Sequence, residues 1–478
     1  MVKWINEGDK NTKFFHLVAN GRRRSNFIED ISLDGVRVLK PSEVIRGICQ
    51  FFKEHLKNIS WEIQSIKGLR LNCLPEVERN SLKEGFSKEE VWVAVCNCDA
   101  NWRVVEEDFK NVIHEFHKNG SIVKELNNTF ITLVPKCAKS ETIRDFRPIS
   151  LTGSMCKVLA KVLANRLKKV MDLNIGDTQM VFIKDRQIMD SFVIAEEIIN
   201  EWENTKEGFL DSMMDKFDFG RKMKNWIKWY IFTPLLSVLV NGSPTPQLGV
   251  ERGLRQGDLL SPFLFNIVMK DLSSLIRKTS DLDMLSGASF GGNSEHITYL
   301  QFMDDTILYL KPRVEYLINT RRILRCFEWA SGLRINFHKS CVVKVGKKEG
   351  REFDWVSVFK CKKSSLPITY LGLPLGEKPC TKSFWSPLVL CVENRLTTWK
   401  RKFLNKDGRL VLIKVVLSSI PMYFMSVFKI LVGVAHMIEK IQRSFLWGNG
   451  VAKKKTHGVQ WDMVCKRKKW RLRNRTEF

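Results

Sequence analysis

The chain has 478 residues, 44% of them hydrophobic, which is enough for a large core divided among two or three packed units. Lysine and arginine number 78 against 52 aspartate and glutamate, and the net charge of +26 favours a polyanionic partner, above all nucleic acid. The start of the sequence lacks an apolar signal region, and no apolar stretch is long enough to span a bilayer, so we expect an intracellular protein with no membrane partner. Twelve scattered cysteines without C-x-x-C pairs favour reduced thiols over disulfides.

Residues 1–58 form a basic segment in which Asp34-Gly35 predicts a hairpin turn and Ser42–Lys57 predicts a helix. Residues 59–128 are charged and helical in pattern, and Ser87 followed by Glu90 predicts a capping box at the start of one helix. The histidines of H-E-F-H in this region lack a second ligand pair at zinc spacing, so a polar helix face is the favoured interpretation.

From residue 129 the pattern changes to extended structure, with T-F-I-T-L-V-P-K followed by D-F-R-P-I-S-L-T-G and then a helix near Ser154–Met171. Lys136 and Arg147 lie at the ends of the two extended pieces. Paired cations on a hairpin can hold a triphosphate, and solvated surface charges are the alternative.

The next hairpin is predicted around Asn241-Gly242, between Ser237–Val240 and Gln247–Val250. It leads into a polar turn, R-Q-G-D, which opens a helix with proline at an early position. The glycine of this turn allows close approach of the backbone to a ligand.

The stretch I-T-Y-L-Q-F-M-D-D-T-I-L-Y-L has two β-forming runs, Ile297–Phe302 and Thr306–Leu310, which flank a break of three residues with Asp304 and Asp305. Adjacent residues of a continuous strand point to opposite faces, so a turn is needed to bring both carboxylates to one site. Paired carboxylates at the tip of a buried hairpin suit Mg²⁺, which takes oxygen ligands and shares them with phosphates. The alternative is an ordinary acidic turn.

The remaining segments predict a helix near Glu315–Ser331, a turn-rich segment at Tyr370–Gly376 and a helix at Phe384–Asn405. Within the last helix, W-K-R-K-F combines basic and aromatic residues, which suits either a phosphate backbone or a solvated outer face. Residues 451–478 read as a basic tail.

The motifs occur in a known order: L-V-P-K, D-F-R-P-I-S-L, N-R-L-K-K-V, R-G-L-R-Q-G-D-L-L-S-P-F-L-F, F-M-D-D, S-G-L-R-I-N-F-H-K-S, Y-L-G-L-P-L-G and F-L-W-G. Together they resemble the reverse transcriptases of plant non-LTR (LINE-type) retrotransposons. The resemblance implies an α+β right-hand polymerase, with fingers and an antiparallel palm sheet at 129–376 and a helical thumb at 377–450. Group II intron maturases share the palm but match the later blocks less closely.

The resemblance also implies roles for individual residues. Lys136 and Arg147 match the fingers cations that grip the incoming triphosphate, while Gln256 and Gly257 match the loop that lines the nucleotide and template pocket. Lys339 falls in a motif near the phosphates.

The family resemblance makes Asp304 and Asp305 the catalytic, metal-binding pair. Tyr370, Leu371 and Gly372 match the grip on the primer strand. The implied cofactor is Mg²⁺ or Mn²⁺, and the implied partners are an RNA template, a DNA primer and deoxynucleoside triphosphates, with a nuclear location favoured and the oligomeric state open.

Two departures from the family pattern are expected to impair activity. The palm strand that carries the third metal-binding carboxylate has no room in residues 201–208, and a proline- and glycine-rich loop is missing at Asn101-Trp102. The nearest acids, Asp211, Asp215 and Asp218, belong to a helix that follows the lost strand and are expected to face solvent.

Three readings of the departures remain open. The chain is an impaired enzyme, a non-catalytic nucleic-acid-binding remnant, or a faulty gene model in which both segments were removed as false introns. Without the strand, the palm sheet is expected to be one strand short and to leave an open edge beside the Asp-Asp hairpin. Sequencing the transcript across Asn101-Trp102 and Gly208-Phe209 separates a real loss from an error.

Overall fold

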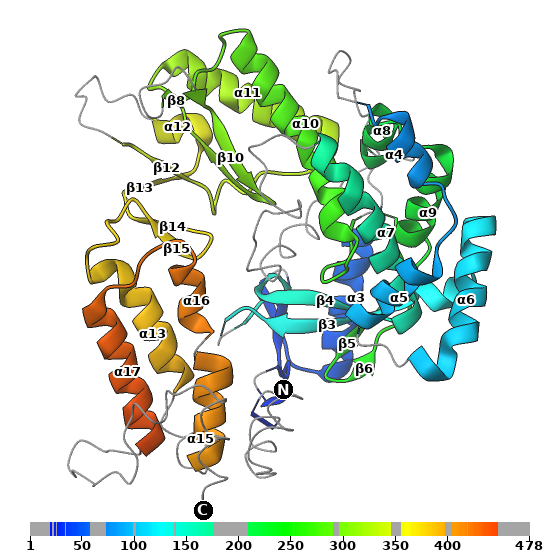
Figure 1. The fold of residues 1–478 in the computed structure, drawn as a ribbon, viewed down its shortest axis with the longest axis horizontal. Coiled ribbons are helices and arrows are strands. Elements are labelled where there is room, and N and C mark those ends of the chain that lie inside the picture. Colours follow the sequence, from blue (N-terminus) through cyan, green and yellow to red (C-terminus); the bar gives the residue numbers. More distant parts are fainter. Residues whose placement is uncertain are drawn as a thin grey trace, which may run out of the picture. The chain divides into compact units, whose positions relative to one another are not determined.

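The structure is a computed structural model of the chain (Figure 1). It describes residues 20–447 apart from the segments 58–72, 99–101, 138–139, 175–208, 290–295, 346–354 and 397–403 and the positions 22, 25, 34, 252, 405 and 418. The chain folds as two compact units. The sheet unit comprises Ser25–Val342 and Lys348–Lys362, and the helical unit comprises Met1–Arg24, Val343–Lys347 and Lys363–Phe478.

The largest sheet belongs to the sheet unit, and its strands are β3 (Thr129–Pro135), β4 (Phe146–Thr152), β5 (Leu235–Val240), β6 (Ser243–Pro244) and β7 (Leu248–Gly249). The strand order is β4-β3-β5-β6, and β7 also pairs with β5. β3 is antiparallel to β4 and parallel to β5. The sheet is therefore mixed, as expected for an α+β fold.

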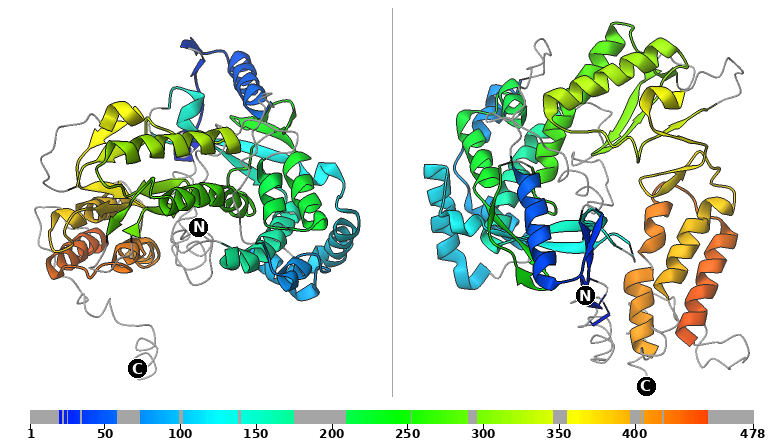
Figure 2. Two further views of the ribbon diagram at one scale, coloured as in Figure 1. Left: turned by 90° about the horizontal axis from the view of Figure 1, so that it is seen from above. Right: turned by 180° about the vertical axis from the view of Figure 1, so that it is seen from behind.

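One face of this sheet is covered by α3 (Pro41–Leu56), which crosses the strands in the rear view of Figure 2. Alternate residues of β3, Ile131 and Leu133, are buried against Ile48 and Phe52 of the helix. This follows from the period of two along a strand, which puts one set of side chains in the core. The opposite face carries Phe130, which is 48% exposed.

Helices make up the rest of the sheet unit: α4 (Glu76–Ser81), α5 (Lys88–Asn97), α6 (Trp102–Asn119), η1 (Lys124–Asn127), η2 (Ile143–Asp145), α7 (Ser154–Asn174), α8 (Phe209–Lys216), α9 (Arg221–Phe232), α10 (Ser261–Asp281), α11 (Val314–Ser331) and α12 (Trp355–Phe359). The largest hydrophobic core joins α7, α8, α9 and α10 and includes the fully buried Trp226 and Leu163. Leu264, Val268 and Leu272, which recur at helical spacing along α10, all lie in this core.

Short hairpins complete the sheet unit: β1 (Ile31–Leu33) with β2 (Val36–Val38), β8 (Ala288–Ser289) with β9 (His296–Ile297), and β10 (Tyr299–Phe302) with β11 (Asp305–Leu308). The turn predicted at Asn241-Gly242 is confirmed between β5 and β6. Both of its residues have positive φ, +52° and +92°, the conformation for which Asn-Gly is favoured in two-residue hairpins.

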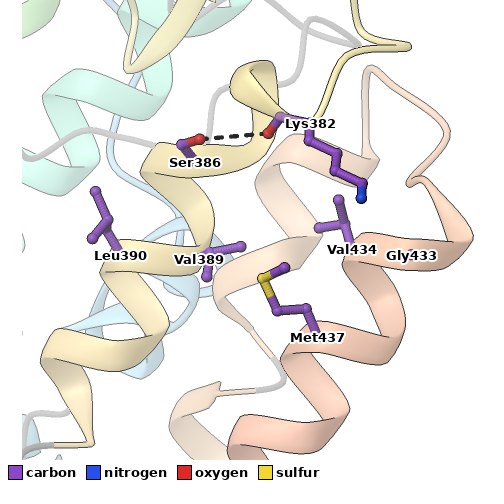
Figure 3. A pocket seen from close by; sticks show the side chains of 7 residues that line it. All are labelled: Lys382, Ser386, Val389, Leu390, Gly433, Val434 and Met437. Atoms are coloured by element: carbon purple, nitrogen blue, oxygen red, sulfur yellow. Dashed lines mark hydrogen bonds between the residues drawn. The ribbon is translucent and has the colours of Figure 1, made fainter.

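The helical unit contains the hairpin of β14 (Ile368–Tyr370) and β15 (Leu373–Leu375) and the helices η3 (Ser383–Trp385), α13 (Ser386–Arg395), α15 (Lys406–Leu412), the π-helical η4 (Ile413–Leu417), α16 (Ile420–Met425) and α17 (Val432–Trp447). The two remaining strands are β12 (Cys341–Val343) and β13 (Lys362–Ser364). A small groove between α13 and α17 is lined mainly by apolar side chains, including Val389, Val434 and Met437, with Lys382 at one side (Figure 3).

The predicted helix at Phe384–Asn405 is wrong in its extent. α13 ends at Arg395, because Leu396 takes φ −105° and ψ 32° and leaves the helical conformation, and Leu404 is not helical. The W-K-R-K-F segment and the missing-loop position before Trp102 lie outside the described residues, as do the segment of the expected third acid and the basic tail. No described helix is long and apolar enough to cross a membrane.

Arg166, from the N-R-L-K-K-V motif of α7, ties the start of α5 to the core. Its guanidinium forms a bidentate pair with Glu90 at 2.8 Å and donates to the carbonyls of Leu82, Glu84 and Gly85 at 3.2, 2.8 and 3.0 Å. Half of the predicted capping box is confirmed, since the Ser87 hydroxyl accepts the Glu90 N–H at 3.1 Å. The Glu90 carboxylate instead accepts hydrogen bonds from Arg166.

Arg166→Lys is expected to lower the free energy of unfolding by about 1–3 kcal/mol, because an ammonium lacks the planar fork and leaves buried carbonyls unpaired. Urea unfolding followed by circular dichroism measures the loss. Lys168→Gln, at an exposed position of the same helix, is the control and is expected to change stability by less than about 0.5 kcal/mol. Equal stability of the two variants would contradict a structural role for Arg166.

Candidate active site

The Asp-Asp hairpin is present, with a tighter turn than predicted. β10 and β11 are antiparallel, and Phe302 pairs with Asp305, so the turn consists of Met303 and Asp304 alone. The predicted three-residue break is therefore wrong by one residue, because Asp305 already belongs to β11 and completes a two-residue loop, the commonest hairpin connection. Asp304 is half-buried and Asp305 is exposed, so both carboxylates lie at the tip.

The hairpin is anchored in the core by residues of its turn and of β10. Met303 has φ +52° and a fully buried side chain, which packs in the main core of the sheet unit with Tyr299. The hydroxyl of Ser273 on α10 donates to Gln301 Oε1 at 3.0 Å. Burial of Met303 within the turn stabilises the hairpin that carries the half-buried Asp304 and the exposed Asp305.

The R-Q-G-D turn lies directly on β4. The carbonyl oxygen of Gln256 accepts the N–H of Ser150 at 2.9 Å, and Gly257 follows with φ +82°, a conformation that side chains other than glycine rarely adopt. The Gln256 side chain is buried, and its Oε1 has no hydrogen-bond partner among the described residues. A buried amide oxygen without a hydrogen-bond partner among the described residues is a candidate contact for a ligand.

Two charged residues on either side of Gln256-Gly257 fix this turn, and sequence analysis predicted a role for neither. Arg255 is buried and donates to Asn127 Oδ1 at 2.9 Å, to Thr129 Oγ1 at 3.2 Å and to the carbonyl of Tyr230 at 2.9 Å. Its guanidinium also stacks on the Tyr230 ring, 4.1 Å from the centroid.

On the other side of the turn, Asp258 accepts the hydroxyl of Tyr230 and the N–H groups of Leu260 and Ser261, both at 3.1 Å. The last two are at the start of α10, where a carboxylate satisfies helix donors that have no partner within the helix. Burial raises the pKa of Tyr230 well above its ordinary value, so its hydroxyl stays protonated and remains a donor to Asp258.

Lys136 and Arg147 lie at the same end of the β3–β4 hairpin. Val134 is directly opposite Arg147, and the Lys136 N–H donates to the carbonyl of Asp145 at 2.9 Å, which continues the register past the end of β3. Side chains two residues apart share a face, so the two cations are diagonal neighbours on one face of the hairpin. Gly257 packs against the same strand pair, since a Cβ placed on it would lie 3.6 Å from Ile149 Cγ2.

The turn before β4 is held by Asp145, whose carboxylate accepts the N–H and the hydroxyl of Thr142, both at 2.8 Å. The hydrogen bond from the Thr142 backbone is the main cause that lowers the pKa of Asp145. Asp145 therefore stays ionised and orders the connection that presents Lys136.

Lys339 and the Y-L-G segment lie apart from these elements in the chain. Lys339 is exposed, in a turn where its N–H donates to the carbonyl and to the side-chain oxygen of Asn336, both at 3.1 Å. In the helical unit, Tyr370 ends β14, and Leu371 and Gly372 form a two-residue turn with φ +51° and +77°. The hydroxyl of Tyr423 on α16 donates to the Leu371 carbonyl, which holds this turn against the helices.

The acids nearest to the expected third ligand are engaged by cations. Asp211 lies 3.1 Å from Lys224 Nζ and 3.0 Å from Lys228 Nζ, and its side chain is 12% exposed, so the expectation that it faces solvent is wrong. Asp215 lies 2.5 Å from Lys224, and Asp218 pairs with Arg79. These last two are 65% and 45% exposed, as expected. No group of three or more His, Cys, Asp or Glu side chains suited to a metal occurs in the described part of the chain.

Asp211→Asn is expected to leave any polymerase activity unchanged, because two lysines already neutralise its carboxylate. The free energy of unfolding is expected to fall by about 1–3 kcal/mol, because Asp211 and Lys224 are both largely buried and the substitution leaves the lysine with one fewer partner. Primer extension at equal concentrations of folded protein measures the first effect, and urea unfolding the second. A loss of extension as deep as that caused by a substitution at Asp304 would identify Asp211 as a metal ligand.

Residues 134–375, about half of the chain, match the reverse transcriptase (RNA-dependent DNA polymerase) family. The chain belongs to this family. The matched range contains Lys136, Arg147, the R-Q-G-D turn and the Asp-Asp hairpin. The mixed helix-and-sheet architecture of the sheet unit agrees with the polymerase fold that membership implies.

Curated relatives agree with the family assignment. The chain is 26% identical over 378 residues to a transposon TX1 uncharacterized 149 kDa protein of Xenopus laevis, which covers 72% of this chain and 28% of the relative. It is 24% identical over 236 residues to a retrovirus-related Pol polyprotein from the type-1 retrotransposable element R2 of Popillia japonica, covering 46% of this chain and 32% of that protein. The predicted relation to non-LTR reverse transcriptases is confirmed.

A shorter match concerns a putative ribonuclease H protein of Arabidopsis thaliana, with 36% identity over 97 residues, which are 20% of this chain and 16% of that protein. The chain spans about a third or less of the length of these three relatives. The match alone therefore does not assign the activities of these longer proteins to this chain.

Proposed function

We propose that this protein is the reverse transcriptase domain of a LINE-type retrotransposon lineage, built for RNA-templated DNA synthesis from a DNA primer and impaired in that reaction. The observation that supports the proposal best is the pair Asp304-Asp305 at the tip of a hairpin whose turn residue Met303 is anchored in the core. The family match over the same region supports it independently.

The two carboxylates fit a hard divalent cation such as Mg²⁺ or Mn²⁺ in donor type, since both metals prefer oxygen ligands. A metal bound there would stabilise negative charge on the attacking and leaving oxygens of nucleotidyl transfer. In number the donor set is short, because the described residues supply no third carboxylate at the tip. A site with one ligand too few binds its metals weakly and positions the primer hydroxyl poorly, and a 1 Å displacement alone can cost about a hundredfold in rate.

The chain's own cations and backbone supply the other functions of the site. Lys136 and Arg147, on one face of the β3–β4 hairpin, are suited to neutralise a triphosphate. Gln256 and Gly257 are held against β4, where an amide side chain and an exposed backbone can contact the nucleotide and its template base. Lys339 and the Tyr370–Gly372 turn are proposed to contact phosphates and primer, respectively.

The proposal extends to the domain plan: fingers and palm at 129–376 with the palm one strand short, a thumb at 377–450, and basic or helical extensions before residue 129 and after residue 450. β10 and β11 form a two-stranded sheet within the described residues, which agrees with an open edge beside the hairpin. An intracellular and nuclear location is proposed because DNA primers occur there, and it can be tested by imaging a tagged chain.

Primer extension tests the function. The full chain is incubated with a labelled DNA primer annealed to an RNA template, deoxynucleotides and either Mg²⁺ or Mn²⁺. The expected result is short, slow, metal-dependent extension that stops on addition of a chelator. Binding of the primer–template without extension under either metal would favour the rival function, a non-catalytic nucleic-acid-binding remnant, for which the charge of +26 is the supporting observation.

A further inference from the structure

The outer face of α11 carries a stripe that none of the roles above uses. Ile318, Arg322, Arg325 and Trp329 are spaced by four, three and four residues, which places them on one side of the helix. All four are exposed, Ile318 by 38% and Trp329 by 70%. We call these four residues the α11 stripe.

The fold of α11 does not depend on this stripe. The opposite side of the helix is buried, with Tyr316, Leu317, Ile323, Leu324 and Phe327 inside the sheet unit. α11 runs beside α10, where the two helices make extensive contact (Figure 1). Substitutions on the stripe are therefore expected to spare the core, and a tryptophan so exposed contributes little to stability.

The charge of the stripe is positive and uncompensated. Neither Arg322 nor Arg325 pairs with a carboxylate in the described part of the chain, and the Arg322 guanidinium donates to the neutral Asn319 Oδ1 at 3.5 Å. The carboxylate of Glu328 is turned to the backbone N–H of Ile335 at 2.7 Å. Two guanidinium groups beside a flat, exposed aromatic ring match the chemistry of single-stranded nucleic acid, in which phosphates alternate with bases that can stack.

We propose that the α11 stripe binds single-stranded RNA, as a surface separate from the residues assigned to polymerisation. Arg322 and Arg325 contact phosphates, and Trp329 stacks on a base. The contact is centred on the half of the helix from Arg322 to Trp329. At the other end Asn319 donates to the carbonyl of Met284 at 2.9 Å, and the exposed Asp281 and Asp283 beside it repel a polyanion.

The experiment uses the full chain and a fluorescein-labelled, single-stranded RNA of mixed sequence and about 20 nucleotides, without metal or deoxynucleotides. Fluorescence anisotropy gives Kd at several salt concentrations. Arg322→Gln/Arg325→Gln is compared with Arg46→Gln/Lys53→Gln, which removes two exposed cations from one face of α3. Trp329→Ala is compared with Trp329→Phe and with Trp92→Ala, at a tryptophan that is 50% exposed on α5.

The double arginine variant is expected to weaken binding by about tenfold at physiological salt and to lower the slope of log K against log salt by about 1.4, the amount for two contacts to single strands. Trp329→Ala is expected to weaken binding by about tenfold with an unchanged slope, and Trp329→Phe to restore most of it, because stacking needs only a flat ring.

Equal binding by the double arginine variant and its α3 control would overturn the proposal. A second outcome would also overturn it. If Trp329→Ala abolished self-association, measured by light scattering, and left the RNA affinity unchanged, the stripe would be a protein interface. RNA affinity is measured without metal or deoxynucleotides and primer extension with both, so a failure of the polymerase proposal and a failure of the α11 proposal are distinguishable.

Discussion

Asp304→Asn is expected to reduce metal-dependent primer extension to background, a loss of about a hundredfold or more. Replacing the carboxylate by an amide removes a charge from the proposed metal site, which is expected to have few ligands. The metal contributes several kcal/mol to transition-state stabilisation, and about 1.36 kcal/mol corresponds to a tenfold change in rate. The half-buried position of Asp304 in a tight turn leaves little freedom for a neighbouring acid to take its place. Extension with labelled primer in Mg²⁺ and in Mn²⁺ measures the effect.

The matched control is Asp281→Asn, an exposed acid at the end of α10 with the same change in charge. Both variants are expected to melt at the temperature of the wild-type chain, because neither carboxylate supports the core. Extension by Asp304→Asn at the wild-type rate would contradict the assignment of the catalytic pair. Extension lost equally in both variants would show that the effect of Asp304→Asn is not specific to the proposed catalytic pair.

Features that depend on local sequence were predictable. The Asp-Asp hairpin follows from two β-forming runs around polar residues, and the Asn241-Gly242 turn follows from the two positive φ angles that these residues tolerate. The helix expected at Glu315–Ser331 is α11, displaced by one residue at its start. Even the error at the Asp-Asp turn is local, since a strand that begins at Asp305 rather than Thr306 changes one backbone pair.

Features that depend on distant partners were not predictable. The arginine of R-Q-G-D is bound by Asn127, which is 128 residues away in the chain, and nothing in either segment alone indicates the pairing. Asp211 was expected to face solvent because acids on a charged helix normally do, yet two lysines of α9 cover it. The position of Arg255 and Asp258, next to a glycine turn and a buried helix, was the one available signal of these contacts. Charged residues that become buried when such a turn packs must be paired.

The ion pairs of Asp211, Asp215 and Asp218 also bear on the proposed impairment. Each acid is held by a cation of α9 or α4, so recruitment of one of them to the tip of the hairpin would leave a lysine or arginine without its partner. The cost of that exchange favours the present arrangement. These three acids are therefore no ready substitute for a third carboxylate, which is why the proposed impairment predicts slow rather than normal extension.

Arg255→Leu is expected to destabilise the fold and to impair nucleotide binding at the same time. Leucine fills the site but removes three hydrogen bonds and leaves the Asn127 oxygen and the Tyr230 carbonyl with fewer donors, at a cost of about 3 kcal/mol in the free energy of unfolding. The R-Q-G-D turn then loses one of its two anchors, and Gln256 and Gly257 lose their fixed position against β4.

Thermal melting and the KM for deoxynucleotides measure the two effects of Arg255→Leu. The melting temperature is expected to fall by roughly 5–10 °C. The KM is expected to rise in the fraction that stays folded, because positioning of the turn is needed for binding. Arg277→Leu, at an exposed position of α10, is the control and is expected to change neither quantity.

Arg255→Lys separates charge from geometry. It keeps the cation and loses the fork that contacts Asn127, Thr129 and Tyr230 together, so an intermediate loss of stability is expected. A wild-type melting temperature for Arg255→Leu would show that Asp258 and Tyr230 alone hold the turn.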